Sequence, residues 1–257
     1  MEWIALSKKK HSKIALKRKK TFFFAQKQIL VPLGDFELQT AVQNFPIVFS
    51  RDKGKIRLFG LLGLEAGKNL FVDSNGLWKT KFLPASLGTF PFRIGKLKDG
   101  NNILLFLEDS EVIVDGDEGE PLFNESGEET EILQSLNKVL AGLARSGDAI
   151  DNVCLMLDEL GLLEPLVFQI KREDGNSAEL KGLFRVNLTL FGNLEDEHFI
   201  KLRKANALEV IYAHLFSMAS ISTLVDLINQ DGKAGSSLKE LGAKIFEKAD
   251  QEIDFEF

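Results

Sequence analysis

The spacing of the apolar residues changes near the middle of the chain, and this change most limits the possible folds. Before an acidic loop at 115–131, short β-branched and aromatic runs alternate with turn sequences such as Asp52-Lys53-Gly54. Residues of this kind favour tight turns between antiparallel strands. After the loop, apolar residues recur every three or four positions, as in amphipathic helices. The sequence therefore predicts an α+β fold, in which a twisted antiparallel sheet from the N-terminal half is packed by helices mainly from the C-terminal half.

The same patterns place individual elements. Asp35 is a suitable cap for a short helix, and Pro84 suits the first turn of another. Strands are expected at 46–49, 56–64 and 70–72, a hairpin at 166–170 and 180–186, and helices at 36–43, 85–89, 132–143, 148–161, 195–204, 208–229 and 238–249.

Charge and composition divide the 257 residues into three parts. Residues 1–20 are expected to form a basic N-terminal arm, because eight Lys or Arg fall between Lys8 and Lys20. Residues 21–230 are expected to form a single α+β domain, β-rich over 21–115 and helix-rich over 128–230. Residues 231–257 are expected to hold a linker, a last helix and an acidic tail.

Alternative readings stay open for each end of the chain. The arm is expected to be a solvated segment leading into the first strand, with too few apolar residues to offset the entropy of ordering; binding of an anionic partner is the alternative. Over the last eight residues, acidic side chains alternate first with Gln251 and then with apolar residues. These residues form a frayed end, an added edge strand or a docking peptide.

The cysteine count and the apolar runs predict a cytoplasmic protein. The single cysteine, Cys154, excludes an intramolecular disulfide and fits a reducing compartment. The apolar run after the basic N-terminus is only five residues long, which is shorter than the core of a secretory signal. The longest uncharged stretch, 210–225, is also shorter than the roughly 20 residues of a membrane span. We therefore expect no membrane span.

No motif identifies a catalytic or metal-binding centre. The three histidines, His11, His198 and His214, lack the spacing that places two imidazoles on one helix face. Cys154 lies on the apolar face of its predicted helix, where a buried and inert thiol is the usual outcome. His214 stands beside an apolar stripe, so it is either a hydrogen-bonded core histidine or a pocket-lining donor or base. We therefore assign no catalytic residue, no metal and no cofactor.

Several blocks of sequence carry a family resemblance. They read PLGDFEL, NFPIVFS, GLLGLEAGKNLFVDSNGLW and FLPASLGTFPF between Pro32 and Phe92, followed by GEPLF, GLLEP, GLFRV and YAHLFSM. This series resembles the SapC family of bacterial proteins, named for an association with surface-layer protein genes. Where relatives usually carry two arginines before the Tyr-Pro-Phe block, this chain has Gly88-Thr89-Phe90-Pro91-Phe92, with Arg93 nearby.

The resemblance implies an accessory role in a cell-envelope, surface-layer or uptake system. Members are often encoded near flavin-dependent halogenase-like proteins, cupin-like proteins and TonB-dependent receptors, so a protein partner from such a gene neighbourhood is expected. The first hypothesis is a non-catalytic binding or assembly factor. The alternatives are an enzyme acting on a small molecule or modified peptide, or a binder of an anionic partner through the arm. Nucleic acid is not an expected partner, and the sequence does not predict an oligomeric state.

The residues expected to form a ligand or partner surface combine polar turn residues with an aromatic one. A simple hairpin does not require a tryptophan after its turn. We therefore expect these side chains to gather on the rim of the sheet. Burial of the tryptophan in the core is the alternative. The residues are Asn69, Asp73, Trp78 and Arg93, with His214 as a further candidate.

Overall fold

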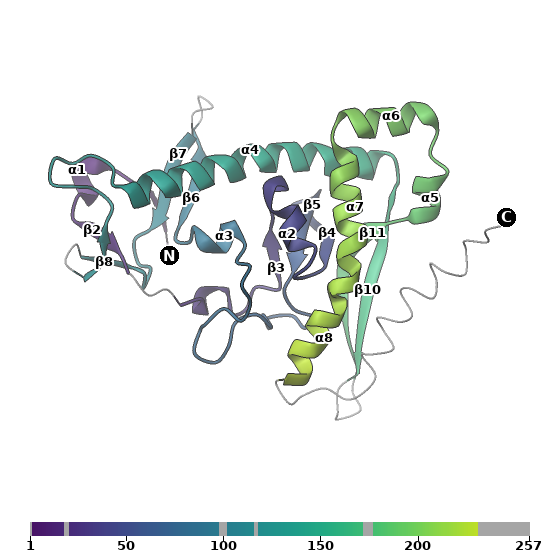
Figure 1. The fold of residues 1–257 in the computed structure, drawn as a ribbon, viewed down its shortest axis with the longest axis horizontal. Coiled ribbons are helices and arrows are strands. Elements are labelled where there is room, and N and C mark those ends of the chain that lie inside the picture. Colours follow the sequence, from purple (N-terminus) through teal and green to yellow (C-terminus); the bar gives the residue numbers. More distant parts are fainter. Residues whose placement is uncertain (1, 18–20, 98–101, 116–117, 172–176, 231–257) are drawn as a thin grey trace.

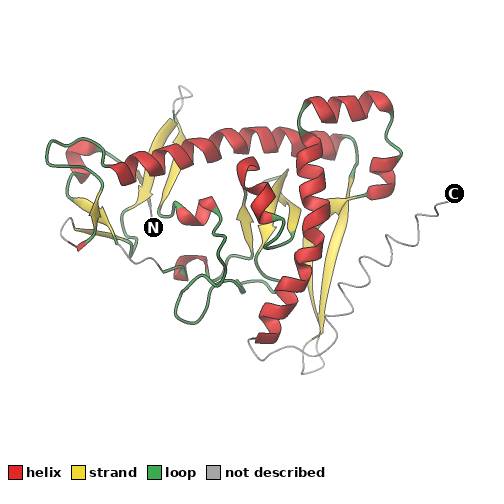
Figure 2. Ribbon diagram, in the orientation of Figure 1, coloured by secondary structure: helices red, strands yellow, loops and turns green. Residues whose placement is uncertain are grey.

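The computed structural model describes residues 2–17, 21–97, 102–115, 118–171 and 177–230. It shows an α+β protein with three antiparallel sheets, drawn in Figure 1 and by element type in Figure 2. The fold class predicted from the sequence is confirmed. The turn at 174–176, the predicted helix 238–249 and the acidic tail lie outside the described residues.

The largest sheet has five strands in the order β10-β11-β4-β5-β3. Its strands are β3 (Leu30–Pro32), β4 (Ile47–Asp52), β5 (Lys55–Leu61), β10 (Leu163–Lys171) and β11 (Ser177–Val186). The predicted hairpin is present as β10–β11, and the predicted strands 46–49 and 56–64 pair as β4 and β5, with positive φ angles at Lys53 and Gly54 in their turn. Two of the five strands come from the C-terminal half, so the sheet is not built from the N-terminal half alone. The predicted strand at 70–72 is a turn region with one isolated bridge, from Val72 to Trp78.

Two smaller sheets lie beside it. One has the order β1-β7-β6 and comprises β1 (Trp3–Ala5), β6 (Phe92–Lys96) and β7 (Asn102–Leu107). The other has the order β8-β2-β9 and comprises β2 (Ile14–Leu16), β8 (Ile113–Asp115) and β9 (Glu120–Pro121). Together they surround a second apolar core, centred on Phe92, Phe106 and Leu122.

The N-terminal segment is part of this second body. β1 pairs with β7, β2 pairs with both β8 and β9, and a short helix, α1 (Lys8–His11), joins the two strands. Ala15 is fully buried, and the buried ring of His11 contacts Phe106 edge-on at 4.9 Å between centroids. The expectation of a solvated arm is therefore wrong for residues 2–17, because partners about 100 residues away in sequence bury their apolar side chains.

One long helix, α4 (Glu131–Glu159), connects the two cores and crosses the length of the molecule in Figure 1. Leu133 and Leu140 pack in the second core, whereas Val153 and Leu157 pack in the main core. The sequence predicted two helices with a break before residue 148. The helix continues through this stretch, where buried Ser146 accepts a hydrogen bond from the Asp35 backbone N–H, and it stops near Gly161, which has a positive φ angle.

The remaining helices are short or lie after the β10–β11 hairpin. Helices α2 (Leu38–Ala41) and α3 (Ala85–Gly88) occupy the regions predicted as short helices. Helices α5 (Leu188–Gly192), α6 (Asp196–Lys204), α7 (Ala207–Ser217) and α8 (Ile221–Gln230) follow the hairpin. A 3₁₀ turn, Met218–Ser220, joins α7 to α8, where the sequence predicted one continuous helix.

The run Ala207–Ile228 is long and apolar enough, by length and composition alone, to cross a membrane. A core helix of a soluble protein meets the same criteria. Here α7 contacts β4 and β11 of the large sheet, and the absence of a membrane span stays a prediction.

Candidate protein-binding surface

Three of the predicted site residues lie in the loop region between β5 and α3, where their polar atoms bind the protein itself. The buried amide of Asn69 donates to the Ala25 carbonyl and accepts from the Phe71 N–H. One carboxylate oxygen of Asp73 accepts the N–H groups of residues 75 and 77, both at 2.8 Å. These contacts shape the loop.

Trp78 is half-buried rather than displayed on a rim. Its indole N–H donates to the Phe82 carbonyl at 2.8 Å, and its ring stacks on Phe71 with 5.4 Å between centroids. Arg93 lies on β6, in another sheet, with its guanidinium 4.0 Å from the ring centroid of Trp3. A ligand-binding role for these residues stays a prediction, and the contacts described here are internal.

His214, the fifth candidate, bridges two strands of the large sheet. Its fully buried ring accepts the Val186 N–H at Nε2, 3.2 Å away, and its Nδ1 donates to the Ile47 carbonyl, 2.7 Å away. β11 and β4 pair at Leu183–Ser50 and Phe184–Phe49. Continuing that register by two residues brings Val186 opposite Ile47. The imidazole therefore occupies the place of the next rung of the ladder, with one donor and one acceptor matched to the two backbone groups.

Ser217 completes this arrangement one turn further along α7. Its hydroxyl accepts the Ile47 N–H at 2.8 Å and donates to the His214 carbonyl at 2.7 Å. Burial lowers the pKa of His214 to about 4, and the Ile47 hydrogen bond opposes this shift only in part. The ring is therefore neutral near pH 7, as the Nδ1–H tautomer requires. This geometry fits the first of the two sequence readings, a hydrogen-bonded core histidine.

The other buried ionisable groups also serve the fold. Burial raises the pKa of the Cys154 thiol to about 12, so the nucleophilic thiolate is strongly disfavoured. Burial raises the pKa of Glu37 as well, against two backbone hydrogen bonds that lower it. That carboxylate accepts the N–H groups of Ala85 and Gly34, at 2.6 and 2.8 Å, and thereby joins the starts of two short helical segments. Within the described residues, no group of three or more His, Cys, Asp or Glu could hold a metal ion.

A surface of linked aromatic rings lies on α5, α6 and α7. We call Phe191, Phe199, Tyr212 and Phe216 the aromatic surface. Phe191 contacts Phe199 and Tyr212, and Tyr212 stacks on Phe216, with centroid distances of 6.0–6.2 Å. The exposed fraction is 67% for Phe216, 42% for Tyr212 and 37% for Phe199. Large apolar groups gathered on a surface in this way are typical of interaction sites.

The helices that carry the aromatic surface add further apolar and charged groups. Leu188 and Leu190 on α5 and Ile200 on α6 are exposed as well. The last turn of α6 carries the basic residues Lys201, Arg203 and Lys204. The helices therefore combine an apolar centre with the basic end of α6, where Lys201 is paired with Glu197. Aromatic and arginine side chains are the types enriched at the centres of protein interfaces.

Comparison with protein families identifies the chain. A sequence model of the SapC family matches residues 6–224. The chain belongs to the SapC family. Searches of curated proteins and of solved structures returned no match.

The blocks that carry the SapC resemblance meet in the structure. His214 and Ser217, from YAHLFSM, bind Ile47 of NFPIVFS, and His214 also binds Val186 of GLFRV. In the same way, Glu37 of PLGDFEL accepts the N–H of Ala85 from FLPASLG. These blocks of the SapC-family protein therefore fix the packing of α7 on the sheet and the entry into α3.

The sequence predictions did not identify the aromatic surface. Its rings stand in segments with helical apolar spacing, which predicts burial on one face. Exposure depends on how α5, α6 and α7 fold back on one another after the hairpin, which spacing does not encode. The signal that was available is the number of large apolar residues in α7, since Tyr212 and Phe216 fall outside the stripe of Val210, Ile211 and His214.

Proposed function

We propose that this protein is a non-catalytic, cytoplasmic binding or assembly factor, accessory to a bacterial cell-envelope, surface-layer or uptake system. The observation that carries the proposal is the aromatic surface, which exposes contiguous rings on three helices without burying them in the described part of the chain. SapC-family membership supports the choice of system through the associations that the resemblance implies.

We propose that the occupant is a partner protein in which acidic residues flank an apolar side chain. This apolar side chain packs against the aromatic surface. The rings supply an apolar anchor site, and the basic last turn of α6 supplies the complementary charge. Such a partner places its anchor against Tyr212 and Phe216 and its carboxylates near Arg203 and Lys204. An amphipathic helix or a short extended segment satisfies this chemistry.

The positions of the ionisable groups with shifted pKa values favour the binding hypothesis over the enzyme hypothesis. An enzyme needs groups with shifted pKa values that converge on a cavity. The large shifts in the described residues belong to His214 and Cys154, which are buried, and the ring nitrogens of His214 are engaged by backbone atoms. These positions favour structural roles.

The test compares two matched surface variants of the full chain. Phe216→Ser removes the most exposed ring of the aromatic surface, and Leu155→Ser removes an apolar side chain on α4 that is 54% exposed. We first identify the proteins that co-purify from the native host with the wild type and with Leu155→Ser, but not with Phe216→Ser. These proteins are then expressed and titrated against the purified chain. We expect at least a tenfold loss of affinity for Phe216→Ser, because central interface aromatics contribute about 2 kcal/mol or more.

Charge reversal then checks the chemistry of the occupant. Arg203→Glu is expected to weaken the same complex and to reduce its salt dependence. Equal binding by wild type and Phe216→Ser would overturn the proposal. So would a concentration-dependent dimer that Phe216→Ser abolishes, or binding that appears only when residues 231–257 are deleted, since the occupant would then be a second copy or the chain's own acidic end.

A further inference from the structure

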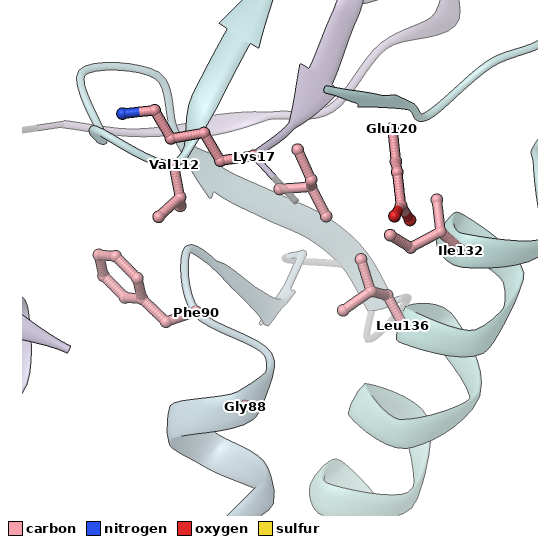
Figure 3. A pocket seen from close by; sticks show the side chains of 8 residues that line it. Lys17, Gly88, Phe90, Val112, Glu120, Ile132 and Leu136 are labelled. Atoms are coloured by element: carbon pink, nitrogen blue, oxygen red, sulfur yellow. The ribbon is translucent and has the colours of Figure 1, made fainter. Parts of the chain in front are cut away.

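A cavity of about 240 Å³ lies at the seam between the N-terminal sheet and the long helix. Figure 3 shows its lining, which comes from the end of β2, from the end of α3 and the residues after it, from the residue before β8, from β9 and from the first turns of α4. Segments far apart in the sequence therefore form one hollow. It is distant in the fold from the aromatic surface, which lies on α5–α7.

Five apolar side chains line part of the cavity, and several of them are held in place by further contacts. Leu16, Ile132 and Leu136 line it and also pack against the second core. The ring of Phe90 forms another wall and stacks on Phe24 at 3.6 Å between centroids, with 9° between the ring planes. A cavity with supported walls is formed before a ligand arrives, which lowers the cost of binding.

Two charged residues line this space, Glu120 and Lys17, and both are exposed to solvent. Glu120 lies on β9, opposite Leu16, and its carboxylate is directed into the cavity beside Ile132 (Figure 3). Lys17 also lines the cavity, but in this view its amine points away from Glu120. Among the described residues, the ion pairs join other groups, such as Arg51 with Asp158 and Arg185 with Glu164.

Size and charge together define the class of ligand. An apolar cavity of about 150 Å³ is large enough for benzene. A volume of about 240 Å³ therefore has room for a six-membered ring with a short chain. We propose that this cavity binds a small primary amine that carries one aromatic or branched apolar group, with the ammonium on Glu120 and the apolar group between Phe90 and Leu136. This site is independent of the partner-binding surface.

The test uses three probes of one shape and different charge. 2-Phenylethylamine, 2-phenylethanol and 3-phenylpropionate are titrated into the ¹⁵N-labelled full chain and followed by amide chemical shifts. We expect the amine to shift the amides of Leu16, Phe90 and Leu136 and to bind about tenfold more tightly than the alcohol, because a charge-assisted hydrogen bond is stronger than a neutral one. The carboxylate is expected to bind more weakly than either.

Two variants separate charge from shape. Glu120→Gln is expected to weaken the amine about tenfold and to leave the alcohol unchanged, whereas the exposed control Glu108→Gln alters neither. Leu136→Phe narrows the cavity and is expected to weaken both probes. If it does not fold, Glu120→Gln decides alone. Any one of three results would overturn the proposal: the amine and the carboxylate bind with equal affinity, Glu120→Gln does not change the affinity for the amine, or the amides at the cavity show no chemical-shift change up to about 10 mM probe.

Discussion

Replacing His214 tests whether an imidazole can stand in for a rung of the strand ladder. His214→Ala leaves the Ile47 carbonyl and the Val186 N–H without the ring nitrogens that now bind them. Each buried group left unsatisfied costs about 1–3 kcal/mol, and loss of the ring against Phe49 adds a packing cost. We therefore expect a loss of at least about 3 kcal/mol in the free energy of unfolding.

The same contacts predict how stability depends on pH. Burial lowers the pKa of His214 from its ordinary value of 6.5 to about 4 in the folded protein. Between these values the unfolded state binds the proton and the folded state does not, so stability falls as pH falls. The contribution of the neutral ring is complete above about pH 6.5 and declines by roughly 3 kcal/mol by pH 4. Protonation would also place an Nε2–H against the Val186 N–H.

Urea unfolding at several pH values measures this contribution. Wild type, His214→Gln and the control His198→Gln, on α6, are compared from pH 7 to pH 4. Glutamine does not titrate, so the stability difference between wild type and His214→Gln should shrink by about 3 kcal/mol over this range, while the His198→Gln difference stays nearly constant. A His214→Gln difference that is small at pH 7, or that does not change with pH, would refute the strand-bridging role.

Three further predictions concern the rest of the fold. Deletion of residues 2–17 is expected to lower the melting temperature by more than about 5 °C, because it removes β1 and β2 from their sheets; an unchanged melt would contradict the pairing. The Cys154 thiol, with its pKa raised to about 12, is expected to react with a thiol reagent at pH 8 only after unfolding, and rapid labelling of the native protein would contradict its burial. Glu37→Gln places an amide N–H against one of two backbone donors, and we expect urea unfolding to show a loss of about 1–3 kcal/mol at pH 7; a neutral effect would argue against the bridge to Ala85.

The parts of the fold that the sequence predicted are those encoded locally. The hairpins β4–β5 and β10–β11 join apolar runs across a few turn residues, so their pairing follows from nearby sequence. The continuous helix α4 was missed because Ser146 and Gly147 resemble a helix boundary, while the two cores that hold the helix on either side of them are tertiary features. Local preference was overridden by packing.

The N-terminal segment shows what local sequence does not predict. Its lysines predicted a solvated arm, and five of them, Lys8, Lys9, Lys10, Lys13 and Lys17, are exposed. The apolar residues between them pair with strands about 100 residues later, and no local spacing reports such a partner. The candidate sites share this limit: the predicted polar residues make contacts within the fold, as Asn69 does with Ala25 and His214 with Ile47, and the aromatic surface and the cavity also arise where distant segments meet.

Helix α7 links the stability argument to the binding proposal, because one face packs on the large sheet and the other carries rings of the aromatic surface. On one face, His214 and Ser217 hold the helix to β4 and β11 through three hydrogen bonds to backbone groups of the strands. On the other face, Tyr212 and Phe216 are exposed and stacked on each other. A helix fixed in this way presents its rings in one position, so a partner need not order them on binding. We therefore expect a substitution that removes the buried His214 contacts to weaken binding at the proposed surface, although His214 lies on the opposite face of the helix.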